Sequence, residues 1–182
     1  MGRPKQTLEF EGTSLLRRAA QAALGAGCSP VIVVTGANAE VSRRELSGLD
    51  VREVLNPDWQ TGMASSIAAG LDGLLNIDRN AVAVVIMVCD QPYVTADVVS
   101  RLVSAHRLNP DSVIASKYDE SFGVPALFTR PLFDELARLR GPAGAKEVIR
   151  KHAAGATFLP FPEGEVDVDT PEVLARVLSP TV

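Results

Sequence analysis

Asp90 is the first residue whose type and position could support chemistry. It directly follows nine consecutive apolar residues, 81–89, and precedes Gln91 and Pro92. The apolar run predicts the most buried strand of the domain, and Gln91-Pro92 predicts an extended turn that aims the carboxylate out of the sheet. An alternative is that Asp90 only begins the next helix, but Thr95 is better placed to cap that helix. We therefore expect Asp90 at a ligand site.

A second acidic segment, EVDVDTPEVL, lies near the carboxyl end of the chain. It places Asp167 and Asp169 two residues apart, and on a strand such residues point to the same face. Asp169 is also a candidate cap for the helix that Pro171 begins, and the two interpretations are compatible. If Asp169 approaches Asp90, the two carboxylates would repel one another unless a cation lay between them. Proteins hold Mg²⁺ with one or two carboxylates plus substrate phosphates, so the pair predicts phosphate chemistry.

Two further segments carry residues that suit a phosphate-bearing ligand. The segment GRPK, residues 2–5, provides two cations in a loop shaped by Gly and Pro, although such a segment is ordinarily a flexible terminus. The loop NPDWQTGM, residues 56–63, contains the only Trp and leads into a helix. A glycine-containing turn before a helix can bind an anion or a base edge through backbone N–H groups. Capping by Ser65 and Ser66 and packing by Trp59 are the alternatives.

Several other chemistries lack support in this sequence. It contains no GxSxG, HExxH or GxGxxG pattern, and its two cysteines lack the spacing of a zinc site or a disulfide framework. His106 and His152 fall late in expected helices, where they suit the helix dipole, and we do not expect either to be catalytic. Lys and Arg total 18 against 22 Asp and Glu, so the net charge of −4 provides no general attraction for nucleic acid or an anionic membrane. The longest apolar run is about half of a membrane-spanning helix, and we expect a cytoplasmic protein without membrane or nucleic-acid partners.

Secondary structure must position these residues, and the chain alternates short β-branched runs with segments of helical period. The alternation predicts one domain over residues 1–182, a Rossmann-like three-layer α/β/α sandwich with a mostly parallel sheet. Ligands of such sheets bind beyond the carboxyl ends of the strands, where Asp90 is expected. The expected strands are 31–34, 51–55, 82–88, 113–116, 124–128, 157–160 and 166–168. The expected helices are 13–24 with Thr13 as N-cap, 39–46, 65–75, 96–108, 131–139, 146–153 and the segment that Pro171 begins.

In chain order, GRPKQTL, VIVVTG, NPDWQTGMASSIAAGL, VCDQP, GVPALF, GPAGAK and DVDTPE resemble the motifs of the MobA-like nucleotidyltransferases. The likeness covers nearly the whole chain and is greatest to the molybdenum cofactor cytidylyltransferases. The resemblance implies a fold of the nucleotide-diphospho-sugar transferase type. It also implies Mg²⁺-dependent transfer of a nucleotide from a triphosphate to a phosphorylated acceptor, with release of pyrophosphate. In this branch the donor would be CTP and the acceptor a molybdopterin-type molybdenum cofactor, with a molybdoenzyme as a further partner.

The same resemblance implies roles for individual residues. Lys5, Asp90 and Asp169 would be catalytic, with the two carboxylates holding Mg²⁺ and Lys5 neutralising triphosphate charge. The residues implied to bind the nucleotide are Arg3, Lys5, Asn56, Gly62 and Ser66. The residues implied to bind the acceptor are Gly123, Pro125 and Lys146, the last within the loop 141–146.

The chain departs from the family pattern in two places. Family members begin with a strand and a glycine-rich loop of the type LAAGxSxRMG, whose amides bind the triphosphate, and Met1 falls where the Met of that loop would fall. We therefore expect an N-terminally incomplete domain with a strand missing from the middle of the sheet. We also expect slower catalysis than in an N-terminally extended version. In GPAGAK, Pro142 and Lys146 stand where the cytidylyltransferases tend to have an acid and an arginine, and Lys cannot grip a phosphate in the bidentate manner of Arg.

These departures leave alternatives open. A guanylyl or sugar-phosphate nucleotidyltransferase is compatible with the motifs, because the part of the glycine-rich loop that selects the base is missing. A non-catalytic cofactor-binding module is a different class that also fits. Comparing the affinities for CTP, GTP and ATP with and without Mg²⁺ would separate these alternatives.

Overall fold

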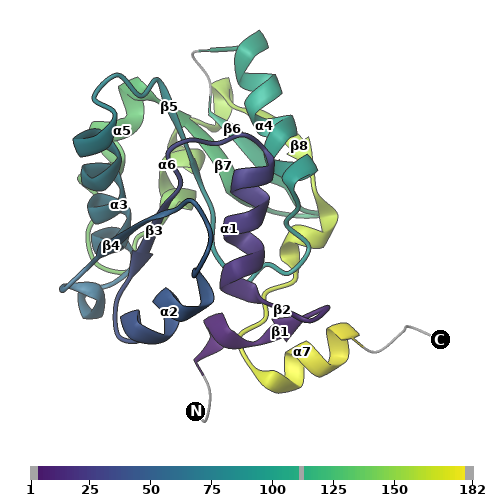
Figure 1. The fold of residues 1–182 in the computed structure, drawn as a ribbon. Helices are drawn as coiled ribbons and strands as arrows, with labels where there is room; N and C mark the ends of the chain where they lie inside the picture. Colours follow the sequence, from purple (N-terminus) through teal and green to yellow (C-terminus); the bar gives the residue numbers. More distant parts are fainter. Residues whose placement is uncertain (1–3, 111–112, 179–182) are drawn as a thin grey trace.

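The computed structural model describes residues 4–110 and 113–178 (Figure 1). Its strands are β1 (Glu9–Phe10), β2 (Thr13–Ser14), β3 (Ile32–Thr35), β4 (Arg52–Leu55), β5 (Ala83–Ile86), β6 (Ile114–Lys117), β7 (Phe122–Thr129) and β8 (Thr157–Pro160). Its α-helices are α1 (Leu15–Gly25), α2 (Ala39–Glu45), α3 (Met63–Ile77), α4 (Ala96–Leu108), α5 (Phe133–Ala137), α6 (Ala145–Lys151) and α7 (Pro171–Leu178). Short 3₁₀ turns connect them, among them η1 (Lys5–Thr7), η2 (Trp59–Thr61) and η5 (Pro162–Glu165). The order alternates strands and helices as the sequence predicts.

The strands that form the centre of the domain lie in two sheets. The first is the parallel pair β3–β4, and the second has the order β5-β7-β6-β8. Within the second sheet β7 is antiparallel to β5 and to β6, whereas β6 and β8 are parallel. β7 is therefore the reversed strand of this sheet, and the remaining three strands run in the same direction. The expectation of a mostly parallel sheet is met with this one reversal.

β7 shows how the two faces of the larger sheet are covered. Ala126 and Phe128 face a core shared with α3, α5 and α6, whereas Leu127 packs with Leu102 of α4 on the other face. This alternation follows from the two-residue period of a strand. Figure 1 shows α1 and α4 on one side of the sheets and α3, α5 and α6 on the other. The helices and sheets therefore form the expected three-layer sandwich. None of the described helices is long and apolar enough to cross a membrane, and the cytoplasmic location stays a prediction.

β5 is less buried than its sequence predicts. All four of its residues are only partly buried, and Val82 just before it is 69% exposed. Within the described residues, β5 pairs with β7 on one side only, and β3 pairs with β4 on one side only. The prediction that the run 81–89 forms the most buried element is wrong, because hydrophobicity alone does not show whether a strand has a neighbour on each edge.

Three hydroxyl side chains fix the helix ends that surround the site. Ser14 caps α1 by accepting from the N–H of Arg17, so the prediction that Thr13 is the cap is wrong by one residue. Thr95 caps α4 as predicted, and its hydroxyl oxygen accepts from the N–H of Val98. Thr170 accepts from the N–H of Val173 at the start of α7. Since Thr170 serves this helix, the side chain of Asp169 is not needed as its cap.

Candidate functional site

Lys5, Asp90 and Asp169 meet at one point of the structure. The Lys5 ammonium donates to Asp90 Oδ2 at 2.5 Å and to Asp169 Oδ1 at 3.0 Å. The Asp90 side chain is 15% exposed, whereas that of Lys5 is partly buried and that of Asp169 is largely open to solvent. The three residues come from η1, from the turn after β5 and from the segment before α7. The structure brings the two distant carboxylates together with the Lys5 ammonium between them, and the expectation that they hold Mg²⁺ stays a prediction.

Backbone hydrogen bonds explain how the two acidic segments come together. The N–H of Val168 donates to the carbonyl oxygen of Asp90 at 2.7 Å, which places Asp169 beside the Asp90 turn. Val168 itself is fully buried with Leu8 and Leu15, so the acidic segment is anchored by an apolar residue between its carboxylates. The expected strand 166–168 is wrong, since these residues form no strand in the structure. Their extended backbone nevertheless carries the carboxylates to the site.

Gln91 locks the turn that carries Asp90. Its amide donates to the hydroxyl oxygen of Tyr118 at 3.0 Å and to the carbonyl oxygen of Gly164 at 2.7 Å. The Tyr118 hydroxyl in turn donates to the carbonyl oxygen of Val124 in β7. Gln91 is buried, and these two bonds satisfy its amide nitrogen, whereas its Oε1 has no hydrogen-bond partner. The sequence analysis treated Gln91 only as part of a turn. The signal it missed is that a polar residue directly beside a site carboxylate can be buried and hold that carboxylate in position.

The charges of the site depend on one another. Burial lowers the pKa of Lys5, but the hydrogen bonds to Asp90 and Asp169 outweigh this effect and raise the pKa overall, so the ammonium stays charged. Partial desolvation of its carboxyl, followed by the negative charges of Asp90 and Asp169, raises the pKa of Asp167. Burial and the charge of Asp90 raise the pKa of Cys89 to about 11, so this thiol is protonated at neutral pH and is a poor nucleophile.

The donor set fits a hard divalent cation. Asp90 Oδ1 is buried without a hydrogen-bond partner, which is costly for a carboxylate oxygen unless a ligand completes its coordination. Asp90 and Asp169 together supply the carboxylate oxygens that Mg²⁺ prefers. Among the described residues, no group of three or more His, Cys, Asp or Glu side chains is arranged to hold a metal ion. A bound Mg²⁺ would therefore take its remaining ligands from substrate phosphates and water.

The loop 56–62 is held by its own side chains. Buried Asn56 donates to Ser65 Oγ at 2.8 Å and to Ser66 Oγ at 3.1 Å, which links the end of β4 to the first turn of α3. Gly62 has φ +118° and lies so close to Gly141 that a Cβ would overlap with the Gly141 carbonyl oxygen. Asn56 and Ser66, both predicted to face the nucleotide, are thus brought together.

The N-terminus of α3, which follows this loop, has fewer backbone amides available for a ligand than expected. The N–H of Ala64 donates to the Gly141 carbonyl oxygen at 3.3 Å, and the N–H of Ser65 donates to Gly62. These two amides of the α3 N-terminus are therefore used within the protein. The idea that this glycine turn presents them to an anion is not supported by their geometry, although the loop side chains remain at the carboxyl end of β4.

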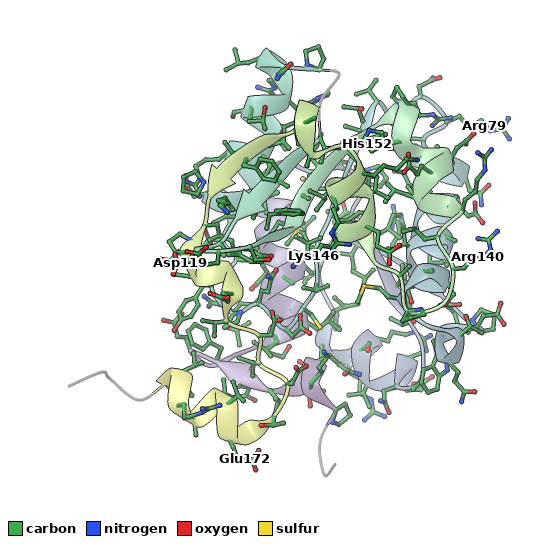
Figure 2. All side chains as sticks on the ribbon, turned by 180° about the vertical axis from the view of Figure 1, so that it is seen from behind. Arg79, Asp119, Arg140, Lys146, His152 and Glu172 are labelled. Carbon is green, nitrogen blue, oxygen red and sulfur yellow. The ribbon has the colours of Figure 1, made fainter. Side chains whose placement is uncertain are left out.

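The predicted acceptor residues gather around the β6–β7 turn. Gly123 lies under the Tyr118 ring, and the carbonyl of Pro125 accepts from Ser116 Oγ at 2.7 Å. Lys146 donates to Ser121 Oγ at 2.7 Å, and Figure 2 shows it near the middle of its face, away from Arg140 at the edge. Gly123 is linked to the Asp90 turn through Tyr118, whereas the described contacts of Lys146 do not reach that turn. Arg3, predicted to bind the nucleotide, lies outside the described residues.

Comparison with known proteins identifies the family. Residues 1–156 match the model of the MobA-like NTP transferase domain. The chain therefore belongs to the MobA-like NTP transferase family, as its motifs predict. The fold also matches that of 4-diphosphocytidyl-2C-methyl-D-erythritol synthase from Anaerococcus prevotii, with a TM-score of 0.71 at 12% identity over 92% of this chain and 86% of that chain. The nucleotide-diphospho-sugar transferase type of fold is thereby confirmed.

Individual relatives extend this comparison. Nicotine blue oxidoreductase of Paenarthrobacter nicotinovorans is 30% identical over 186 residues, which cover 96% of this chain and 88% of the relative. The crystal structure of Rv0371c from Mycobacterium tuberculosis H37Rv has a TM-score of 0.82 and 26% identity, and covers 98% of this chain and 90% of that chain. A structure of Rv0371c in complex with manganese has a TM-score of 0.76 and 28% identity, and covers 97% and 92%. A divalent metal has thus been observed in a relative of this chain.

Proposed function

We propose that the protein is a Mg²⁺-dependent nucleotidyltransferase that transfers CMP from CTP to a molybdopterin-type molybdenum cofactor. The observation that carries the proposal is the Lys5 ammonium held between Asp90 and Asp169. The membership of the chain in the NTP transferase family supports the reaction class. The motifs VCDQP and DVDTPE, which resemble those of the cytidylyltransferases, support the donor and the acceptor.

The reaction forms one bond and breaks one bond. A phosphate oxygen of the acceptor attacks the α-phosphorus of CTP, and the bond from that phosphorus to the oxygen bridging the α- and β-phosphates breaks, which releases pyrophosphate. When bound to Asp90 and Asp169, Mg²⁺ would neutralise the negative charge on the phosphates. Lys5 would bind phosphate oxygens, and its raised pKa keeps it cationic for this role. Asp90 is held ready by the Gln91 network and by the Val168 N–H, so little reorganisation is needed.

Lys5 has two roles in this account. Without substrate it compensates the two carboxylates, which would otherwise repel each other across a short distance. With substrate and metal present, its flexible four-carbon side chain can turn from the carboxylates to a phosphate oxygen. The residue therefore protects the site when empty and contributes positive charge when the triphosphate is bound.

Other donors and reactions compete with this proposal. GTP transfer and sugar-phosphate nucleotidyl transfer use the same carboxylate pair, and a cofactor-binding module would use the fold without turnover. The name of the relative from P. nicotinovorans indicates an oxidoreductase. This chain contains no GxGxxG pattern for a dinucleotide, and its motifs favour transfer over redox chemistry.

A label-transfer assay tests the proposal. The protein is incubated with molybdenum-bearing molybdopterin and with α-labelled CTP, GTP or ATP. Each reaction is run with Mg²⁺ or with a chelator. The label on the acceptor and the release of pyrophosphate are measured. We expect Mg²⁺-dependent transfer with CTP preferred, and its loss in Asp90→Asn. Asp97→Asn is the matched control, because Asp97 is an exposed aspartate on α4 that pairs with Arg101. Nucleotide binding without transfer from any triphosphate, or turnover only with a nicotinamide cofactor, would contradict the proposal.

A further inference from the structure

Trp59 is the only tryptophan of the chain, and it stands at the surface. It lies in η2, and 43% of it is exposed, which is high for so large an apolar side chain. The backbone of Gly36 lies directly against it, since a Cβ at Gly36 would be 2.8 Å from both Cβ and Cγ of Trp59. A side chain at residue 36 would push the indole away. The glycine therefore allows one side of Trp59 to rest closely on the backbone while the other parts of the residue remain accessible.

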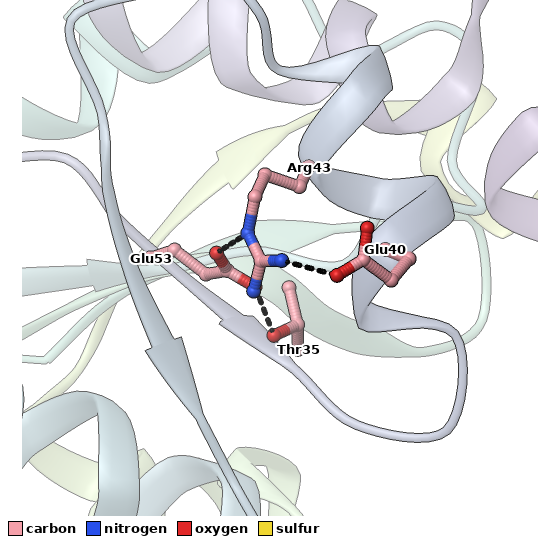
Figure 3. Close-up of polar contacts among 4 residues, drawn as sticks. All are labelled: Thr35, Glu40, Arg43 and Glu53. Carbon is pink, nitrogen blue, oxygen red and sulfur yellow. Dashed lines mark hydrogen bonds and ion pairs between the residues drawn. The ribbon is translucent and has the colours of Figure 1, made fainter.

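The turn that contacts Trp59, at Thr35 and Gly36, is held in place by side-chain hydrogen bonds. Gly36 follows Thr35, whose hydroxyl donates to Glu53 Oε1 of β4 at 2.8 Å. Arg43 of α2 grips the same carboxylate with Nε at 2.7 Å and Nη2 at 3.2 Å, and also contacts Glu40 (Figure 3). This bidentate pair ties β3, β4 and α2 together at the residue that precedes Gly36. The exposed indole is thus positioned on a rigid base.

Two other large apolar side chains near Trp59 in the sequence are exposed. Leu55 at the end of β4 is 59% exposed, and Met63 at the start of α3 is 51% exposed. Three of the large exposed hydrophobic side chains among the described residues therefore fall between residues 55 and 63. The sulfur of Met63 lies against Gly144 of the loop 141–146, since a Cβ there would be 2.9 Å away. Met63, four residues after Trp59, therefore contacts the loop that we propose for the acceptor.

Trp59 also lies at the edge of the sheet where the carboxyl ends of the parallel strands β3 and β4 meet. The N–H of Asn56 donates to the carbonyl of Thr35 at 2.8 Å, so the carboxyl ends of parallel β3 and β4 lie side by side under Trp59. α2, which begins after the β3 turn, packs beside η1, the turn that carries Lys5. Open α/β sheets bind ligands at this edge. Trp59 is therefore on the same edge as the residues that we propose to bind the triphosphate.

We infer that the Trp59 indole is a stacking surface for a planar heteroaromatic ring of the substrates, either the base of the triphosphate or the ring of the acceptor. This inference rests on the proposed function and adds a specificity residue to it. Aromatic side chains bind flat nitrogen-containing rings by stacking, and an indole supported from below is ready to do so without rearrangement. An indole that served only the core would be buried.

Fluorescence tests the inference directly, because Trp59 is the only indole in the chain. The protein is titrated in Mg²⁺ with CTP, with GTP, with a pterin and with inorganic tripolyphosphate, which has no ring. We expect saturable quenching of the Trp59 emission, and protection from acrylamide, by the ring that stacks. Quenching by nucleotides assigns the base, and quenching by the pterin assigns the acceptor. No change with any ring compound, when calorimetry shows that it binds, would overturn the inference.

Variants separate stacking from a structural role. Trp59→Ala should raise the KM for the ring-bearing substrate by at least about tenfold with kcat little changed, whereas Trp59→Phe should stay within about threefold of wild type. Leu108→Ala is the matched control, since Leu108 is an exposed large hydrophobic residue at the far end of α4. Unchanged KM values in Trp59→Ala would overturn the inference while leaving the transfer reaction intact. Quenching without any nucleotidyl transfer would instead retain the stacking surface and reject the proposed function.

Discussion

At the scale of single residues, Asp90 combines two unequal oxygens. Oδ2 binds Lys5, whereas Oδ1 is buried and has no hydrogen-bond partner. An unpaired buried acceptor is costly, and such positions recur where a ligand completes the site. The sequence predicted Asp90 and Asp169 from their positions beside apolar residues, and Lys5 from the resemblance of GRPKQTL to a family motif. It did not predict Gln91 and Tyr118, since their roles depend on contacts between segments far apart in the chain.

Replacing Lys5 tests its part in catalysis. Lys5→Met keeps the length of the side chain and removes its charge, and we expect the transfer rate to fall by about 10²–10³-fold because one preorganised electrostatic contact is lost. The stability should also fall, since the mostly buried Asp90 loses the charge that compensates it beside Asp169. Initial rates of pyrophosphate release measure the effect, with Lys151→Met as a control that removes an exposed ion pair to Glu135. A rate within about threefold of wild type would reject this role.

The raised pKa of Asp167 predicts a pH-dependent effect on stability. A carboxyl whose pKa is higher in the folded state binds its proton more tightly there, so its contribution to stability falls as pH rises through the window between the unfolded and folded values. Asp167→Asn should therefore raise the unfolding temperature at about pH 7 and leave it nearly unchanged at about pH 3. Thermal unfolding followed by circular dichroism at both pH values measures this. A variant that is less stable than wild type at the higher pH contradicts the assignment.

At the scale of elements, periodicity predicted most helices and strands near their observed positions. The strand 157–160 and the helix 96–108 have the predicted bounds, because each combines a clear period with a definite end, such as the Thr95 cap. The strand expected at 166–168 does not form, since that segment forms a single bond to the Asp90 carbonyl rather than a ladder. Close backbone approaches, such as Gly62 on Gly141, could not be predicted from local pattern.

The contact between Gly62 and Gly141 predicts that adding one methyl group at residue 62 strongly reduces folding stability. Gly62→Ala would force an L-residue into a backbone conformation reserved for glycine and push against the Gly141 carbonyl, so we expect a loss of at least about 1–3 kcal/mol. The free energy of unfolding from urea titration measures the loss. Gly155→Ala is the control, because a Cβ there meets no atom within 4 Å, and its effect should stay within about 0.5 kcal/mol. Equal effects of the two substitutions would contradict the described packing.

At the scale of the whole molecule, the sequence predicted the three layers but not how the strands divide between two sheets. The alternation of elements predicted the α/β/α sandwich but not the division of its strands between two sheets. The structure separates β3–β4 from β5-β7-β6-β8, and the apolar strand β5 is only half-buried. Sequence hydrophobicity could not predict this exposure, because burial depends on neighbours that the strand itself does not specify.

Hydrogen exchange tests this description of the sheet. β7 is paired on both sides, whereas β3 and β5 each have one described neighbour. We expect the amides of β3 and β5 to exchange at least about tenfold faster than those of β7, because an unpaired edge opens more readily. β6, which lies between β7 and β8, is the internal control and should be protected like β7. Equal protection of β5 and β7 would show that another segment covers the open edge.

The central claim is that Asp90 and Asp169 hold one divalent cation against a triphosphate. Titration of Mn²⁺ in the presence of CTP, followed by electron paramagnetic resonance of the free ion, measures this binding for wild type, Asp90→Asn, Asp169→Asn and the control Asp97→Asn. We predict one site in the wild type and in the control, with at least about tenfold weaker Mn²⁺ binding in each of the other two variants. Wild-type affinity in both Asp90→Asn and Asp169→Asn would contradict the account.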